Sequence, residues 1–171
     1  MPLAPEVSAF RERLAGLPVT QFRAGENVLT AGSTTGKLLM LRSGSVEVVK
    51  DGEQIAKVST PGAVFGELAV LLDQPHTADV RALEQSEFHI ADAPTVLASD
   101  ATVTLYVAAI LARRLDSANR ALIEVRHQLQ GGESRRKIGK TVERLQGLLG
   151  SGGDPSLVYS GYPYDPFAGN Y

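Results

Sequence analysis

The chain contains no cysteine, which excludes disulfide bonds, thiol catalysis and cysteine-based metal sites. Long apolar runs are missing as well. The longest, near residues 105–112, is too short to cross a bilayer, because a spanning helix takes about 20 apolar residues. The first residues, Met-Pro-Leu-Ala-Pro, have neither the basic start nor the apolar run of a secretory signal peptide. These absences favour a cytoplasmic protein that does not contact a membrane.

Recognisable catalytic and metal-binding patterns are also absent. The three histidines, His76, His89 and His127, fall on different predicted elements and lack the spacing of metal ligands. No Ser/His/Asp set and no pair of carboxylates can be assembled from the pattern. Residues 32–37, Gly-Ser-Thr-Thr-Gly-Lys, are one residue too short for a P-loop and precede a strand instead of a helix. The sequence therefore predicts a binding protein with no metal, no cofactor and no enzymatic activity.

Positive charge is scarce in the first part of the chain and concentrated in the second. Residues 1–100 carry 8 Lys and Arg against 13 Asp and Glu, whereas residues 101–150 carry 9 against 4. A basic segment can meet nucleic acid, but an excess spread along a helix is more often a solvated face. The pattern therefore disfavours a nucleic-acid partner.

Short segments punctuated by glycine follow a predicted helix over residues 4–16. Alternating apolar residues predict strands over residues 38–41, 45–50, 55–59 and 88–90. Asp51-Gly52, between two of them, is a strong hairpin signal. Several short strands at regular spacing predict a mainly β fold with flanking helices, a β-roll or jelly-roll barrel.

The stretch from Phe65 to Ala82 organises the rest of the chain. Gly66-Glu67 precedes a short apolar run over residues 68–72, and a polar turn over residues 73–75 leads into a further strand. A helical turn that starts at a glycine directs free backbone N–H groups and its positive dipole end at one spot, which suits a phosphate. Gly66 lets the anion approach because it has no Cβ. Glu67 beside it could accept hydrogen bonds from a sugar hydroxyl.

Phe65-Gly-Glu-Leu-Ala69, followed by Pro-x-Thr-Ala-x-Val-x-Ala over residues 75–82, resembles the phosphate-binding cassette of cyclic nucleotide-binding domains. These domains occur in catabolite-activator-type regulators, cyclic-nucleotide-dependent kinases and gated channels. The resemblance covers about residues 5–130 and implies a double-stranded β-helix (jelly-roll) domain with a long C-terminal dimerisation helix. It also implies that Glu67 binds the ribose 2′-hydroxyl of cAMP or cGMP, while Gly66 and the amides of Leu68 and Ala69 hold the cyclic phosphate.

The sequence departs from the cassette at His76, where the family carries an Arg that pairs with the phosphate. An Arg–phosphate pair is worth about 1.5–3 kcal/mol, so a neutral His with one donor predicts roughly ten- to a hundredfold weaker binding. Three outcomes are open: weakened cyclic nucleotide binding, a different anionic or neutral ligand, or a vestigial pocket in which His76 is a solvated loop residue. Thr77 stands where a hydroxyl is associated with guanine recognition. The predicted ligand-binding residues are Phe65, Gly66, Glu67, Leu68, Ala69, His76, Thr77 and Ala78.

Glycine and proline are absent between residues 101 and 130, which predicts one long helix with an N-cap at Ser99-Asp100. One apolar stripe, formed by Val103, Val107 and Ile110, is expected to face the barrel. A second stripe recurs at alternating spacings of three and four, as in a coiled coil: Ala108, Leu111, Leu115, Ala118, Leu122, Val125 and Leu129. We expect residues 108–129 to form a homodimer; the alternative is burial within one chain.

Residues 133–149 are predicted to form a short basic amphipathic helix, and residues 150–171 a flexible tail rich in glycine, proline and tyrosine. In the regulators that the chain resembles, a helix at this place begins a helix-turn-helix domain. No recognition helix can be built from the tail, which disfavours operator binding. The predicted organisation is therefore a cyclic nucleotide-binding-like domain over residues 4–130, the basic helix and the tail.

Two functions remain open. In the first, the chain is a regulatory sensor: a cyclic nucleotide enters the β-roll, the cassette and the long helix close over it, and a separate effector protein reads the helix pair. In the second, the chain is an interaction or scaffold protein that uses the fold and the helix dimer without a ligand.

Overall fold

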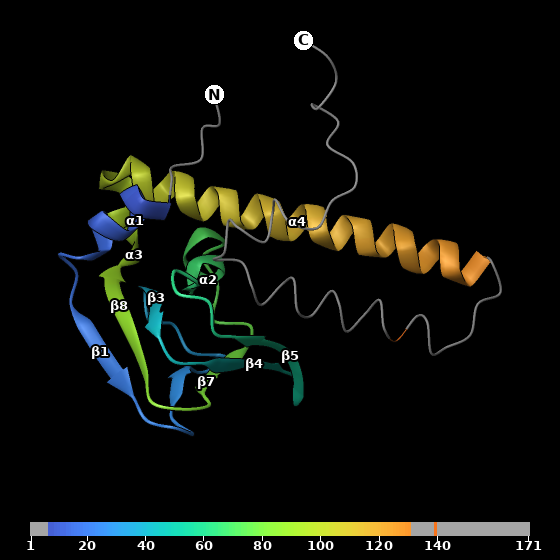
Figure 1. Cartoon of the computed structure of the whole chain (residues 1–171), viewed down its shortest axis with the longest axis horizontal. Coiled ribbons are helices and arrows are strands. Elements are labelled where there is room, and N and C mark those ends of the chain that lie inside the picture. Colours follow the sequence, from blue (N-terminus) through green and yellow to red (C-terminus); the bar gives the residue numbers. More distant parts are fainter. Residues whose placement is uncertain (1–6, 131–138, 140–171) are drawn as a thin grey trace, which may run out of the picture.

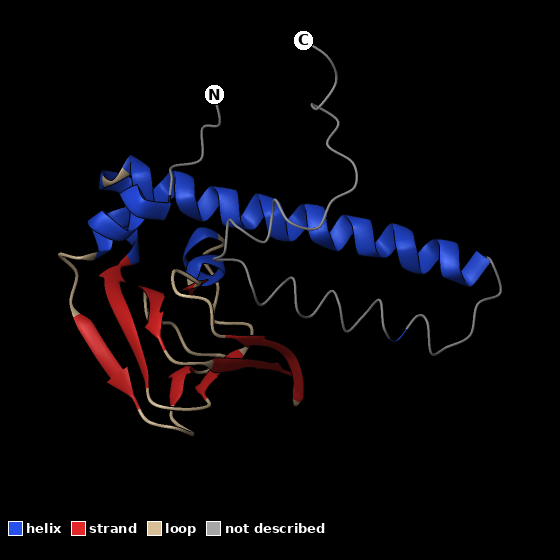
Figure 2. Cartoon of the chain, viewed as in Figure 1, coloured by secondary structure: helices blue, strands red, loops and turns tan. Residues whose placement is uncertain are grey.

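The computed structural model describes residues 7–130 and Gly139. Its strands form two four-stranded antiparallel sheets, with the orders β1-β8-β3-β6 and β2-β7-β4-β5. Figures 1 and 2 show the strands on one side of the molecule and the helices α1, α3 and α4 on the other. The strands are β1 (Val19–Phe22), β2 (Asn27–Leu29), β3 (Lys37–Ser43), β4 (Val46–Lys50), β5 (Glu53–Val58), β6 (Val64–Phe65), β7 (Asp79–Ala82) and β8 (Ser86–Asp92). The predicted jelly-roll class, mainly β with flanking helices, is confirmed.

The hairpin between β4 and β5 illustrates how local sequence sets the fold. Asp51 and Gly52 both have positive φ angles, 53° and 83°, as the tightest hairpin turns require. The register runs from Val46 opposite Val58 to Lys50 opposite Glu53. The Asp-Gly signal therefore predicted both the position of this hairpin and its turn.

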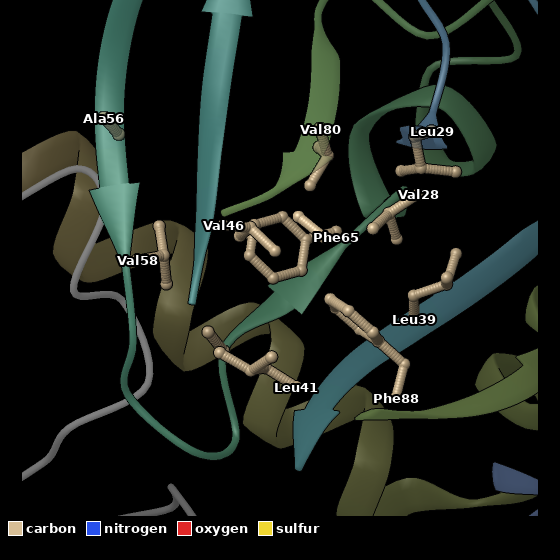
Figure 3. Close-up of a cluster of buried hydrophobic side chains, with 12 residues drawn as sticks. Val28, Leu29, Leu39, Leu41, Val46, Ala56, Val58, Phe65, Val80 and Phe88 are labelled. Carbon is tan, nitrogen blue, oxygen red and sulfur yellow. The ribbon is translucent and has the colours of Figure 1, made fainter. Parts of the chain in front are cut away.

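The space between the sheets is filled by apolar side chains from both inner faces, as Figure 3 shows. Phe88 of β8 makes edge-to-face contacts with Phe22 and Phe65, at ring-centroid distances of 5.6 and 6.0 Å. The buried members of this cluster are Val28, Leu29, Leu39, Leu41, Val46, Ala56, Val58, Ala63, Phe65, Val80, Ala82 and Phe88. Burial of this apolar surface is the main force that holds the two sheets together.

A second apolar layer joins the other face of β3 and β8 to the helices α1 (Val7–Leu14), α3 (Ala93–Ser99) and α4 (Ala101–Gln130). Phe10 of α1 stacks on Tyr106 of α4 with a centroid distance of 3.6 Å. The predicted barrel-facing stripe of α4 is confirmed, because Val103, Val107 and Ile110 are buried in this layer. The cap is confirmed as well, since Asp100 accepts hydrogen bonds from the N–H groups of Thr102 and Val103.

Helix α3 was not predicted from the sequence. The Asp92 carboxylate caps it by accepting a hydrogen bond from the N–H of Thr95, and Pro94 occupies its first turn. Proline is tolerated there because the first N–H groups of a helix have no partner within the helix. Pro94 therefore starts a helix, although the same residue would end one elsewhere.

Two predicted segments, the basic helix over residues 133–149 and the tail over residues 150–171, lie outside the described residues. Within the described ranges, no single helix has both the length and the apolar character of a membrane span; α3 and α4 pass that test only in combination, across a bend of 105°. No group of three or more His, Cys, Asp or Glu side chains is placed to hold a metal ion in this part of the chain.

Candidate functional site

The candidate site is built around the short helix α2 (Glu67–Leu71), which follows β6 directly. Gly66 is its N-cap, in the left-handed conformation with φ 89°, and no side chain caps it. A Cβ added to Gly66 would lie 2.5 Å from the carbonyl oxygen of Lys37, at the start of β3, and 3.6 Å from Cε1 of His76. Glycine is therefore required here both for its backbone conformation and for the close approach of the start of β3.

Gly66→Ala is expected to destabilise the folded chain by roughly 2–5 kcal/mol. The left-handed backbone costs a residue with a Cβ about 1–2 kcal/mol, and the shift of the Lys37 backbone adds about 1–3 kcal/mol. Gly52→Ala is the matched control, because Gly52 has φ 83° and open space around its Cβ position. Urea denaturation of both variants tests this explanation, which fails if the two lose the same stability.

Glu67 does not point into solvent but forms a buried ion pair with the long helix. Nη1 of Arg114, on α4, donates a hydrogen bond to Oε1 of Glu67, and Nη2 donates to the carbonyl oxygen of Val64 at 3.2 Å. Glu67 is 3% exposed, and the Arg114 side chain is 19% exposed. Buried Nε of Arg114 has no hydrogen-bond partner among the described residues. The ion pair links the start of α2 to the middle of α4.

Sequence reasoning missed Arg114 and treated Glu67 as a lone carboxylate. A signal was present, because Arg114 continues the spacing of the barrel-facing stripe of α4, four residues after Ile110 and seven after Val107. A charged residue in line with buried apolar residues indicates a buried partner of opposite charge. The partner lies 47 positions earlier, so no local pattern identifies it.

His76 is held by the loop between β2 and β3. The backbone N–H of His76 donates a hydrogen bond to the carbonyl of Ser33 at 2.9 Å, and its backbone carbonyl accepts one from the N–H of Gly32 at 2.8 Å. Nε2 of the ring lies 2.9 Å from the Thr35 hydroxyl. Because His76 is only 6% exposed, the alternative that it is a solvated loop residue is wrong. Burial lowers the pKa of His76 below its ordinary value, and the Glu67 carboxylate opposes this shift.

The other predicted site residues divide between the site and the core. Ala69 is buried on the inner side of α2, whereas Leu68 and Thr77 are exposed and Ala78 is half-buried. The side chain of Phe65 lies among the residues between the sheets (Figure 3), so only its backbone adjoins the site. The structure thus brings Gly66, Glu67 and His76 together and adds Arg114 and Thr35, which the sequence analysis did not name.

A separate cleft of about 540 Å³ lies between α1 and the sheet that contains β1, β3 and β8. Its lining includes Leu14, Val19, Leu41 and His89, and none of the predicted site residues contributes to it. It provides a second place against which binding at α2 can be compared.

Comparison with known proteins identifies the β-roll. Residues 19–98 match the family model described as the cyclic nucleotide-binding domain. The regulatory subunit of the cAMP-dependent protein kinase of Yarrowia lipolytica is 36% identical over 76 residues, which cover 44% of this chain and 20% of that protein. Glutaminase 2 of Bradyrhizobium diazoefficiens is 37% identical over 106 residues, which cover 57% of this chain and 17% of that protein.

Among solved structures, the catabolite activator protein of Thermus thermophilus has the same fold, with a TM-score of 0.57 and 22% identity over 84% of each chain. Residues 19–98 therefore match the cyclic nucleotide-binding domain family in sequence, and the chain shares the fold of that solved structure. It spans about a fifth of the length of the curated relatives that it matches.

Proposed function

We propose that the chain is a regulatory module that binds a cyclic nucleotide at the start of α2 and transmits its occupancy to α4. The observation that carries this proposal is the buried ion pair between Glu67 and Arg114. It connects the residue proposed to bind the ribose with the helix proposed to carry the response. The proposal contains no catalytic step.

The proposed binding mode uses backbone donors for the phosphate and one carboxylate for the sugar. The N–H groups of Leu68 and Ala69, beside Gly66, face the cyclic phosphate, and Glu67 accepts a hydrogen bond from the ribose 2′-hydroxyl. The rest of the proposed binding site is formed by His76, Thr77 and Ala78, and Phe65 contributes only its backbone. Because Arg114 already binds one oxygen of Glu67, a ligand that moves this carboxylate also moves Arg114 and biases the position of α4.

The response is proposed to pass through a homodimer formed by residues 108–129 and to be read by a separate effector protein. Leu115, Leu122 and Leu129 on the predicted seam are all more than 60% exposed, which supports the pairing of α4 with a second helix. A dimer of this kind has two arrangements of its helices, one of which the bound nucleotide would favour.

A thermal-shift screen with cAMP, cGMP and, as a non-cyclic control, 5′-AMP tests the function. A ligand that binds only the folded state stabilises it by about 2.7 kcal/mol at a hundred times its dissociation constant. We expect a concentration-dependent rise in the unfolding midpoint with at least one cyclic nucleotide and a smaller rise with 5′-AMP. Equal midpoints with all three compounds at millimolar concentration would contradict the proposal.

The low pKa of His76 predicts opposite pH effects on stability and on binding. A folded-state pKa below the unfolded value of about 6.5 gives stability that is present above this pH and is lost as the pH falls through the folded pKa. A bound phosphate favours the charged ring, so nucleotide affinity should rise between about pH 7.5 and 6, by at most tenfold per unit for one proton. Calorimetric titrations at both pH values measure this, and His76→Gln should remove the dependence. Affinity that falls on acidification contradicts a phosphate beside His76.

The second candidate, a ligand-independent interaction protein, is favoured by one observation. Glu67 and His76, two polar side chains of the cassette, already have partners within the chain: Arg114 binds Glu67, and Thr35 binds His76. In that case no nucleotide would shift the unfolding midpoint of the wild-type chain. Glu67→Gln would change the stability of the chain, but the variant would not respond to any nucleotide either.

A further inference from the structure

Three leucines of the cassette are exposed on one face. Leu68 is 43% exposed, Leu71 is 50% exposed, and Leu72, immediately after the helix, is 61% exposed. Residues three and four apart lie on the same side of a helix, so these side chains form a single apolar face, here called the α2 leucine face. The neighbouring side chains of Glu67 and Ala69, on either side of this face, are buried.

A second exposed stripe runs along α4. Leu115, Leu122 and Leu129 are 63%, 66% and 64% exposed and are spaced seven residues apart. Figure 1 shows that α4 continues well beyond the strands, so the sheets do not cover the far part of this stripe. Strict seven-residue spacing of leucines is the pattern of a helix that pairs with a second helix of the same period.

The α2 leucine face and the α4 stripe begin at the same place. The ion pair between Glu67 and Arg114 fixes the start of α2 beside the residue that precedes Leu115. Val70 of α2 and Leu111 of α4 also pack against the same buried cluster, which places the two helices in contact with a common layer. An occupant that lies along the α4 stripe therefore comes close to α2 at the Leu115 end of the stripe.

We infer that the α2 leucine face belongs to the homodimer interface and is covered by α4 of a second copy. A second copy is the fitting occupant because its α4 carries the same seven-residue stripe, and a two-fold interface presents the same patch from both chains. The inference rests on the proposed homodimer and adds that the ligand-binding helix of each chain is packed by its partner. Dimerisation and nucleotide binding would then be linked, each changing the affinity of the other by the same factor.

Sedimentation equilibrium of the full-length chain over a range of concentrations tests this directly. Leu122→Glu, in the α4 stripe, is expected to abolish the dimer. Leu71→Glu and, separately, Leu72→Glu are expected to raise the dimer dissociation constant by about tenfold or more, because each symmetric interface buries the substituted residue twice. Leu83→Glu is the matched control, because Leu83 is 39% exposed and its backbone N–H donates to the carbonyl of Ser45, near the β3–β4 turn. This substitution should leave the dimer dissociation constant unchanged.

The outcomes distinguish the proposed homodimer from the inference that the α2 leucine face belongs to its interface. A wild-type chain that stays monomeric at all concentrations overturns the proposed homodimer and this inference with it. A wild-type dimer whose dissociation constant is unaffected by Leu71→Glu and Leu72→Glu, with unchanged circular dichroism, overturns the inference alone. If residues 131–171 of the same chain covered α2 instead, both substitutions would lower the unfolding midpoint of the monomer and leave dimerisation unchanged, which also contradicts the inference.

Discussion

Arg114→Gln is expected to destabilise the folded chain by about 3 kcal/mol, because it leaves a buried carboxylate without its ion-pair partner. Glu67 is 3% exposed and cannot recover its hydration without a rearrangement of α2. The substitution also removes the donor to the Val64 carbonyl. Nucleotide affinity should fall at the same time, since the carboxylate proposed to bind the ribose is no longer held in position.

Urea denaturation measures this loss, and three further variants separate its causes: Asp116→Asn, Glu67→Gln, and Glu67→Gln combined with Arg114→Gln. Asp116→Asn breaks the exposed pair between Asp116 and Arg120 on the same helix and should cost no more than about 0.5 kcal/mol. Glu67→Gln combined with Arg114→Gln should cost less than the sum of the single changes, because neither partner is then left as an unpaired buried charge. Additive losses would show that the pair does not link α2 to α4.

His76→Arg is expected to raise cyclic nucleotide affinity by about ten- to a hundredfold, because a guanidinium adds a charge-assisted, two-pronged contact to the phosphate. His76 contributes a weaker contact to the phosphate, because burial lowers its pKa and its Nε2 is already hydrogen-bonded to Thr35. The arginine must give up the Thr35 contact, which is a single hydrogen bond worth about 1 kcal/mol.

Calorimetric titration of cAMP and cGMP at pH 7.5 measures the gain. His76→Gln keeps a neutral side chain at the position and should not increase affinity, so it separates charge from loss of the histidine. Thr35→Ala removes the hydrogen-bond partner of the ring without adding charge and should change affinity only slightly. Equal affinity of His76→Arg and His76→Gln would place the phosphate away from position 76.

Much of the fold could be predicted because its signals are local. The Asp51-Gly52 turn, the alternation in β4 and β5 and the apolar stripe of α4 each require only neighbouring residues to be recognised. The family resemblance likewise rests on the contiguous stretch over residues 65–82. Helix α3 was missed because Pro94 is usually a helix breaker, and its position within the first turn depends on a cap that only the fold reveals.

The candidate site could be predicted only in part because its key contacts are long-range. Thr35 reaches His76 across 41 positions, and Arg114 reaches Glu67 across 47. The burial of His76 could not be read from the polar turn that precedes it, because the β2–β3 loop supplies the cover. Sequence patterns place residues on elements, whereas pairing between elements depends on how the two sheets and α4 close around α2.

The central claim, that a cyclic nucleotide binds at the start of α2, is tested most directly by a ¹H–¹⁵N NMR titration of the full chain with cAMP and cGMP. The account predicts saturable shifts of the Gly66, Leu68 and Ala69 amides, accompanied by smaller shifts at Arg114. Saturable shifts confined to residues such as Leu14, Val19 and His89 of the α1 cleft, or no saturable shift at millimolar nucleotide, would contradict it.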